Sequence, residues 1–268
     1  MLLYALNYLY FYLKAGNQHA VHSPFVYKLY TLVVQDKKKY YAFSELEKLR
    51  QELISDHTEL EVTDFGAGSK HTISQKITTN STKKSISKIA RYSATTTKKA
   101  QLLFRLVEYF KPKTILELGT SLGVSTLFMA LAADNLETQI ITFEGCPQIA
   151  KKAKENFEEL KQNNIEIIIG NIDKTLSKSL PSFPLLDFVF LDANHRYEPT
   201  IDYFNQILEK CHNDTIIILD DIHWSAGMEK AWKQIIEHEK VTVSIDLFQL
   251  GLIFLRKEQP KQHFKLRF

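Results

Sequence analysis

The chain has 268 residues and a formal net charge of +3, and 44% of its residues are hydrophobic and 24% are charged. This length suits one α/β domain with an appendage, and the composition is that of a folded protein with a full core. The net charge is too small to demand nucleic acid as a partner. Cys146 and Cys211 lie far apart and form no metal or redox motif, which indicates packed thiols in a reducing, cytoplasmic setting.

The first predicted element is an apolar, aromatic-rich helix over residues 1–13, which ends at Lys14. It is shorter than the roughly 20 residues that cross a bilayer, and neither a basic leader nor a cleavage site accompanies it. We expect this helix to be buried or amphipathic and to pack on its own domain or on a second copy of the chain. Attachment to a membrane surface is the alternative, because an aromatic-rich helix can lie in an interface.

Two further helices are predicted over residues 23–34 and 43–54. Ser23 is placed to cap the first of them, and a proline follows it in the first helical turn. Ser44 and Glu47 have the spacing of a capping box at the start of the second.

The stretch from residue 66 to residue 107 contains nine Lys or Arg residues and no Asp or Glu. Its first part is rich in Ser, Thr and Lys, so it lacks the apolar content to fold alone and is expected to be mobile. Its end has apolar residues at helical spacing, which predicts a helix over 97–110. We expect residues 1–94 to form an N-terminal helical extension with this basic loop.

From residue 113 onward, strands and helices alternate. Strands that are apolar on both faces and alternate with helices indicate a parallel sheet covered by helices. The link between the last two strands is too short for a parallel crossover, so this final pair is predicted to be antiparallel. The predicted strands are 114–118, 139–143, 165–169, 186–191, 215–219, 241–247 and 252–255, with helices such as 147–160 and 198–210 between them.

Two strings of glycines and small residues could each follow a strand and hold a ligand, at residues 62–69 and 115–126. The first, VTDFGAGS, is followed by a polar, basic run, so we expect a turn, with a loop that touches a ligand as the alternative. The second, ILELGTSLGVST, is followed by an apolar helix and then a strand. Only the second string therefore has the order strand, turn, helix, strand that a nucleotide-type site requires.

The second string has Gly119 and Gly123 at a spacing that matches neither the dinucleotide fingerprint nor the phosphate-binding P-loop. Glu117, Glu144 and Asp192 stand at or near the carboxyl ends of three predicted strands. Three carboxylates at one sheet edge would repel a pyrophosphate. They would suit a cationic ligand with ribose hydroxyls, and S-adenosylmethionine is such a ligand.

The successive segments ILELGTSLGVST, ITFEG, LDFVFLDANHRYEPT and IIILDDIHW resemble the motifs of class I S-adenosylmethionine-dependent methyltransferases. More narrowly, they are similar to metal-dependent O-methyltransferases of the catechol type and to relatives with an Asp-x-x-His-x-Tyr-Glu signature. The resemblance covers about residues 95–256. It implies a Rossmann-like methyltransferase domain over 95–268, with a seven-stranded, mostly parallel sheet whose last strand is antiparallel.

The resemblance also implies roles for single residues. Ser125 matches a helix-capping residue of the glycine turn, and Glu144 matches the acid that holds the ribose diol. Cys146 follows closely and lines the adenine pocket or is a buried thiol. Asn171 stands where the family often has Asp, which leaves the adenine contact to the backbone near Ile172. The full set implied to bind the cofactor is Glu117, Gly119, Thr120, Gly123, Ser125, Glu144, Gly145, Asn171, Ile172 and Asp192.

The same resemblance implies that Asp192, Asp220 and Asp221 hold a divalent metal, because three carboxylates suit magnesium. The alternative is that these acids cap helices or bind the cofactor without metal. His195 is the candidate catalytic base, since imidazole takes a proton near neutral pH, and a structural histidine is the alternative. His223 is placed to form a wall of the acceptor pocket together with the tryptophan that follows it.

The implied activity is methyl transfer to a hydroxyl oxygen of a small molecule in the cytoplasm, without a membrane span. A phenol, a sugar hydroxyl and an RNA nucleotide all stay open as acceptors, and a homodimer stays open as the assembly. A non-catalytic methyltransferase-like binding protein is one alternative. An NAD-dependent oxidoreductase is the other, although the glycine spacing disfavours it.

Overall fold

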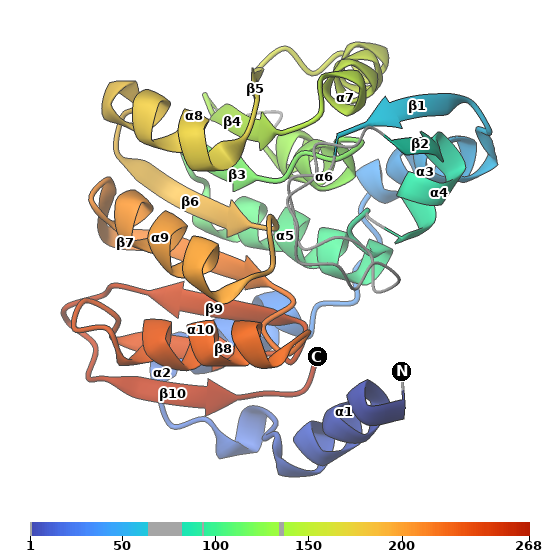
Figure 1. Cartoon of the computed structure of the whole chain (residues 1–268). Helices are drawn as coiled ribbons and strands as arrows, with labels where there is room; N and C mark the ends of the chain where they lie inside the picture. Colours follow the sequence, from blue (N-terminus) through green and yellow to red (C-terminus); the bar gives the residue numbers. More distant parts are fainter. Residues whose placement is uncertain (1, 64–81, 93, 134–136) are drawn as a thin grey trace. The chain divides into compact units, whose positions relative to one another are not determined.

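The computed structural model describes residues 2–63, 82–92, 94–133 and 137–268. The chain forms two compact units. We call Lys38–Pro184 the central unit, and Met1–Lys37 together with Leu185–Phe268 the terminal unit. Figure 1 labels the helices and strands of both.

The central unit contains three parallel strands in the order β3-β4-β5. Every residue of β3 is buried, including the three apolar side chains whose burial the sequence predicts. Because the strands are parallel, their carboxyl ends share one edge, where ligands bind in open α/β sheets. The strands are β3 (Thr114–Leu118), β4 (Gln139–Glu144) and β5 (Ile165–Ile169), and the helices around them are α5 (Thr97–Phe110), α6 (Val124–Ala132), α7 (Pro147–Glu159) and α8 (Ile172–Ser179), with a short 3-10 helix η3 (Leu180–Ser182).

The first part of the central unit packs onto these helices. It consists of α3 (Ala42–Ser55), the antiparallel pair β1 (Glu59–Val62) and β2 (Thr82–Ser85), and α4 (Ile86–Tyr92). Residues from all of them except β2 join one apolar core cluster with α5, α6 and α7, including Leu46, Leu49, Leu53, Val62, Ile86, Ile89, Phe104, Leu127 and Phe157.

Residues 82–92 differ from the mobile stretch that their composition predicts. Ile86, Ile89 and Ala90 are buried, so three apolar side chains at helical spacing are enough to hold α4 on the core. The string DFGAGS at residues 64–69, which we expected to form a turn, lies outside the described residues.

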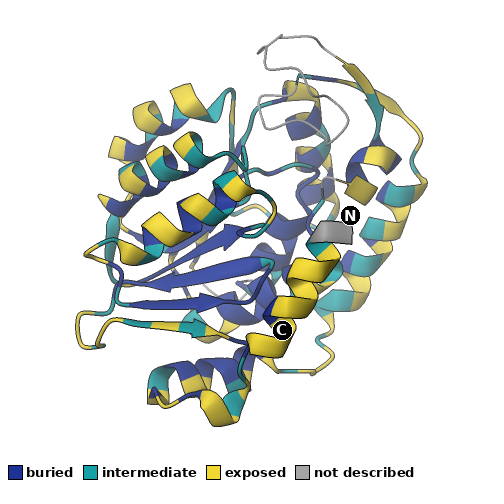
Figure 2. Ribbon diagram, turned by 60° about the horizontal axis from the view of Figure 1, so that its bottom comes forward, coloured by how far each residue is buried: buried dark blue, intermediate teal, exposed yellow. Residues whose placement is uncertain are grey.

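The terminal unit has five strands in the order β10-β8-β9-β7-β6. β6 and β7 are parallel, and β9 is antiparallel to both β7 and β8, so the prediction of an antiparallel final pair is confirmed. Figure 2 shows the central strands of the fold as buried, which agrees with their apolar sequences. The elements are β6 (Leu186–Leu191), α9 (Tyr197–Leu208), β7 (Cys211–Asp220), α10 (Ala226–Glu237), β8 (Val243–Asp246), β9 (Leu250–Phe254) and β10 (Gln262–Lys265).

β10 is the strand that the sequence did not predict. Within the described residues, eight strands run from β3 to β10, where seven were expected. β10 pairs in parallel with β8, and its residues alternate between exposed and partly exposed. A short edge strand of this kind contains no apolar run from which it could be predicted.

The first 37 residues belong to the terminal unit and form α1 (Leu2–Lys14), a 3-10 turn η1 (Gln18–Ala20), α2 (Pro24–Leu29) and a π-helical turn η2 (Tyr30–Val34). The Ser23 hydroxyl accepts a hydrogen bond from the Val26 amide at 3.4 Å, so the predicted cap is confirmed. The predicted capping box at Ser44 is wrong, because α3 begins at Ala42 after Tyr41, without a side-chain cap.

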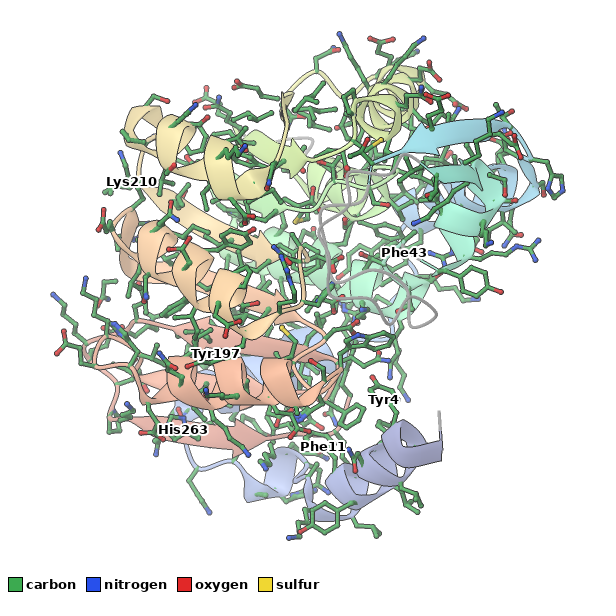
Figure 3. The ribbon with its side chains drawn as sticks, viewed as in Figure 1. Tyr4, Phe11, Phe43, Tyr197, Lys210 and His263 are labelled. Carbon is green, nitrogen blue, oxygen red and sulfur yellow. The ribbon has the colours of Figure 1, made fainter. Side chains whose placement is uncertain are left out.

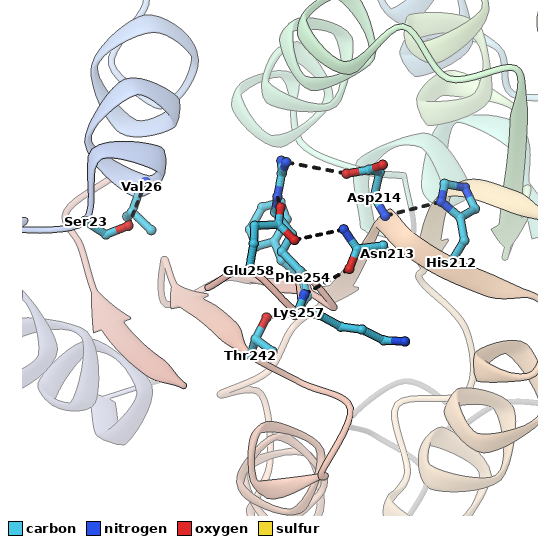
Figure 4. A network of polar contacts seen from close by, with 10 residues as sticks. Ser23, Val26, His212, Asn213, Asp214, Thr242, Phe254, Lys257 and Glu258 are labelled. Atoms are coloured by element: carbon cyan, nitrogen blue, oxygen red, sulfur yellow. Dashed lines mark hydrogen bonds and ion pairs between the residues drawn. The ribbon is translucent and has the colours of Figure 1, made fainter. Parts of the chain in front are cut away.

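A polar network fixes the chain around the start of β7 and the segment after β9 (Figure 4). The Asn213 side chain donates to Glu258 and accepts from the Lys257 amide, both at 2.9 Å. Arg256 lies 3.4 Å from the Asp214 carboxylate. These contacts join two connections that are distant in sequence and leave the other end of β7, at Asp220, for the candidate site.

Candidate active site

A tight loop joins β3 to α6 in the central unit. Gly119, Ser121 and Gly123 have positive φ angles of 105°, 49° and 81°. Glycine adopts such angles without cost, whereas serine does so rarely. The amides of Gly119 and Thr120 both donate to the Phe143 carbonyl at 3.0 Å, so the loop is tied to the end of β4.

Gly123 is required for a second reason, which is the approach of α7. A Cβ atom at this position would lie 2.3 Å from Cε1 of the Phe157 ring. The Asn156 side chain, from the same helix, donates to the Leu122 carbonyl at 2.9 Å. Backbone conformation and helix packing therefore both select glycine here.

Glu117 supports the glycine loop through hydrogen bonds to side chains of α6 and β4. Its side chain is fully buried, with 0% exposure. The carboxylate accepts hydrogen bonds from the hydroxyls of Ser125 at 2.6 Å and Thr142 at 2.7 Å, and from Thr126. A buried carboxylate is tolerated when donors of this kind satisfy it. Glu117 thus positions the glycine loop through α6 and β4, and its burial argues against direct contact with a ligand.

Ser125 has a different role from the expected cap. The N-cap position of α6 is Gly123, without a side-chain hydrogen bond, and Ser125 lies in the first turn. Its hydroxyl is directed to Glu117. The residue is therefore part of the loop's support.

Glu144, at the end of β4, is held by two backbone amides. Oε2 accepts from Ser121 at 2.8 Å and Oε1 accepts from Cys146 at 2.9 Å. A carboxylate has about four lone-pair positions, so it can accept further donors such as ribose hydroxyls. The carboxylate is partly exposed and is fixed in orientation by the two amides.

Sequence reasoning did not single out Ser121. Its hydroxyl is buried and has no hydrogen-bond partner within the part of the chain that the structure describes. Its backbone is in the left-handed region and its amide holds Glu144. The signal that could have found it is a small polar residue between two glycines of a strand-to-helix turn.

The end of β5 lies beside Glu144, because the Gly170 amide donates to the Glu144 carbonyl at 2.9 Å. Asn171 is the N-cap of α8, with its side chain accepting from the amide of Asp173 at 3.0 Å, and Ile172 begins the helix. Gly145 is partly exposed and directly follows Glu144. Cys146 is buried, and its thiol lies 3.5 Å from the Glu61 carbonyl, so it is a packed thiol.

A second group of predicted residues lies in the terminal unit. Asp192 directly follows β6, and its Oδ1 lies 3.3 Å from Nε2 of His195. The other ring nitrogen, Nδ1, is buried and has no hydrogen-bond partner among the described residues. Asn194 and His195 have φ angles of 69° and 40°, a costly backbone conformation of the kind that gathers at functional sites.

The pKa of His195 differs strongly from that of a free imidazole. Burial by itself lowers the pKa of His195, but the hydrogen bond and charge of Asp192, with the charges of Asp220 and Asp221, raise it to about 9. The structure therefore brings all four of these predicted residues into one electrostatic group. At neutral pH this arrangement favours the imidazolium form.

Asp220 and Asp221 stand at the end of β7. Asp220 is nearly fully buried, and the Asp221 amide donates to the Gln249 carbonyl at 2.7 Å with a φ angle of 52°. Three carboxylates have the chemistry that a hard cation prefers. Across the described ranges, however, no group of three or more His, Cys, Asp or Glu side chains is arranged to hold a metal ion.

His223 is engaged on both ring nitrogens. Nε2 lies 2.9 Å from Asp246 and Nδ1 lies 3.5 Å from Glu229. Burial lowers the pKa of His223, but these two carboxylates raise it above its usual value. The ring stacks on Phe248 at 5.1 Å. His223 thus joins α10, β8 and the link after β8, and its position is structural.

The predicted residues fall into two sets. The set in the central unit surrounds the glycine loop and Glu144, and the set in the terminal unit surrounds His195. Asp192, which was expected to touch the cofactor as well as a metal, belongs to the second set and contacts His195.

Parallel strands, a glycine turn and an acid at the end of the second strand define an α/β fold of the nucleotide-binding kind. Residues 116–222 match a protein family described as a methyltransferase domain. The match contains the glycine loop, Glu144, Asp192, His195 and the pair at the end of β7. Residues 116–222 are therefore similar to a methyltransferase domain, and the chain shares its fold with solved methyltransferases.

Two relatives are named catechol O-methyltransferase. The protein of Mycobacterium tuberculosis is 25% identical over 136 residues, which are 50% of this chain and 60% of that protein. The protein of Niastella koreensis is 28% identical over 125 residues, 44% of this chain and 52% of that protein. The chain thus spans between half and two thirds of the length of these relatives. An SAH-bound methyltransferase of Podospora anserina shares the fold, with a TM-score of 0.60, 14% identity and coverage of 88% of this chain and 97% of that one.

Proposed function

We propose that this protein transfers the methyl group of S-adenosylmethionine to a hydroxyl oxygen of a small molecule. The observation that carries the proposal is the His195 ring, which is bound to Asp192 through Nε2 and has a buried Nδ1 without a hydrogen-bond partner in the described part of the chain. The names of the two relatives above support transfer to oxygen and make catechols the first acceptors to test.

Cofactor binding is assigned to the glycine loop and Glu144 of the central unit. The two backbone amides that hold Glu144 fix its carboxylate, which then accepts the two ribose hydroxyls of the cofactor. Such charge-assisted bonds are stronger than neutral ones. Ser121 adds a hydroxyl, and the peptide groups of the loop approach the methionine part because Gly119 carries no side chain.

Removal of the proton from the acceptor is assigned to His195 of the terminal unit. The Asp192 carboxylate accepts from Nε2–H, which leaves the lone pair of the neutral ring on Nδ1. This nitrogen takes the proton of the acceptor hydroxyl as the oxygen attacks the methyl carbon. The bond from that carbon to sulfur breaks, its electron pair stays on sulfur, and the neutral thioether leaves. Aligning the two reactants accounts for much of such an acceleration.

Magnesium is the finer part of the proposal, with Asp192, Asp220 and Asp221 as its ligands. The chemistry of these donors fits, but the described side chains are not arranged as a metal-binding group, so the steps above use protein groups alone. When bound, the ion would lower the pKa of a coordinated hydroxyl.

We further propose residues 95–268 as the catalytic domain with residues 1–94 as its extension, and the cytoplasm as the site of action, since both cysteines are free. Within the described residues, no helix is long and apolar enough to cross a membrane.

The proposal is tested with purified full-length protein and S-adenosylmethionine labelled in its methyl group, against catechols, other phenols, sugars and RNA. Label on a catechol hydroxyl supports it. Calorimetry with S-adenosylmethionine and NADH separates the alternatives. NADH binding alone points to an oxidoreductase, and cofactor binding without turnover on any acceptor points to a binding protein.

A further inference from the structure

The outer face of α1 is apolar and exposed to solvent. Leu6, Leu9 and Leu13 are 55%, 54% and 71% exposed. Their spacing of three and four residues places them on one side of the helix. Tyr10 and Tyr12 lie beside them and are also exposed. Figure 2 shows this helix, next to the N mark, as largely exposed.

The opposite face holds the helix in place. Tyr4 and Phe11 pack against Phe248, with ring centroids 5.1 and 5.3 Å apart, and Phe11 lies 6.0 Å from the His223 ring. Figure 3 shows Tyr4 and Phe11 on this face of α1. Packing within the terminal unit therefore uses the inner face, and the exposed leucines are not needed for it.

Two segments that meet beside α1 are basic. Residues 1–35 and 259–268 contain no Asp or Glu. They meet in the fold, since the Gly16 amide donates to the Lys265 carbonyl at 2.8 Å and the Arg267 amide donates to the Gly16 carbonyl at 3.1 Å. The basic residues of the two segments are Lys14, Lys28, Lys261, Lys265 and Arg267.

Two of these cations lie directly on the exposed tyrosines. The Lys14 ammonium is 4.2 Å from the centre of the Tyr10 ring, and the Arg267 guanidinium is 4.6 Å from that of Tyr12. The charge of Lys265 also reaches the Tyr10 hydroxyl. The apolar face and the positive charges thus form one surface, which we call the α1 surface: Leu6, Leu9, Tyr10, Tyr12, Leu13, Lys14, Lys265 and Arg267.

We propose that the α1 surface docks on an anionic phospholipid bilayer, with α1 lying in the plane of the interface. Leucines reach the boundary of the acyl chains, tyrosines suit the interfacial layer, and cations are attracted to anionic headgroups. A two-fold pairing of two α1 surfaces would instead bring like charges together in segments without a carboxylate side chain to balance them. The charge of the surface therefore favours a lipid partner over a second copy.

The test is sedimentation of the full chain with vesicles of phosphatidylglycerol and phosphatidylcholine in equal amounts, and with vesicles of phosphatidylcholine alone. We expect binding to the mixed vesicles that weakens with salt and is at least tenfold weaker without phosphatidylglycerol. The pairs L9Q/L13Q and K14Q/K265Q should each weaken binding about tenfold or more. Both pairs change exposed side chains, and an unchanged melting temperature verifies the fold.

Matched controls lie outside the two acid-free segments. Leu185, which is 58% exposed, gives the control L185Q, and two exposed lysines give K233Q/K240Q with the same change of charge. Both controls should bind as the unaltered protein does. Absence of binding to the mixed vesicles, or equal binding by all variants, would overturn the proposal. A dimer in light scattering that L9Q/L13Q converts to a monomer, without vesicle binding, would overturn it in favour of a second copy.

Discussion

The Nε2 atom of His195 lies 3.3 Å from Oδ1 of Asp192, and the Nδ1 atom of the same ring is buried without a hydrogen-bond partner in the described residues. The carboxylate fixes the orientation of the ring and selects the tautomer with the proton on Nε2. One nitrogen is thereby oriented and the other is left to exchange a proton. A general base held by an acidic residue has this arrangement.

Replacing His195 with alanine should lower the rate of methyl transfer by about 10²–10⁴, the usual size of general-base catalysis. Affinity for S-adenosylmethionine should change little, because the ring is not expected to touch the cofactor. Turnover and calorimetry measure the two quantities. The control is His212→Ala, which removes another histidine paired with an aspartate, at 2.8 Å from Asp187, and should keep its activity. Near-normal turnover of His195→Ala would show that the ring is structural.

The pH dependence of turnover should follow the raised pKa of His195. A base acts when it is neutral, and the folded-state pKa is about 9 against an ordinary value of 6.5. After exhaustive chelation, activity should therefore rise with pH, with its midpoint near pH 9, and then level off. The measurement is the pH profile of kcat at saturating cofactor.

Adding magnesium should move that midpoint to lower pH if Asp192, Asp220 and Asp221 bind it, because a nearby cation disfavours the imidazolium. Cofactor affinity should stay the same. Identical profiles with and without the metal would remove magnesium from the proposal and leave His195 alone to activate the acceptor hydroxyl.

Much of the fold is predictable from local patterns. The helix over 97–110 and the strands over 114–118, 165–169 and 186–191 have the predicted boundaries, because each has a strong apolar period or run. The sequence does not predict β10, because this strand is weakly apolar and is stabilised by pairing with β8. It does not predict α4 either, because this short helix is held by packing on α3, which is distant in sequence.

The site divides in the same way. The glycine turn and the strand-end acids are local features that the order of strand, turn and helix locates in the sequence, whereas their expected roles come from the resemblance to methyltransferases. The burial of Glu117 beneath three hydroxyls, the pairing of His223 with Asp246 and the role of Ser121 depend on contacts between separate elements. Residue spacing along the chain therefore does not predict these three contacts.

Gly123→Ala should destabilise the central unit by about 2–4 kcal/mol. A φ angle of 81° is energetically unfavourable for alanine. The alanine Cβ would also lie 2.3 Å from the Phe157 ring, and overpacking of this kind costs about 1–3 kcal/mol. Denaturant unfolding of the protein measures the change. Gly227→Ala is the control, since a Cβ there meets only ordinary contacts of 3.6 Å or more in the first turn of α10. A loss of stability of equal size in both variants would contradict the reason given for Gly123.

Glu144→Ala should weaken the binding of S-adenosylmethionine by about tenfold or more. The estimate rests on the loss of hydrogen bonds to a charged group, worth about 1.5–3 kcal/mol each. The same substitution leaves the amides of Ser121 and Cys146 without their acceptor, so the loop itself loosens.

Glu144→Gln separates the two effects, because its carbonyl oxygen can still accept one amide while the charge is lost. We expect Gln to fold as the unaltered protein does and to bind the cofactor nearly as weakly as Ala. Glu158→Ala, on the exposed side of α7, is the control and should bind normally. Calorimetry measures all four proteins, and full affinity in a folded Glu144→Ala would assign the ribose hydroxyls to another group.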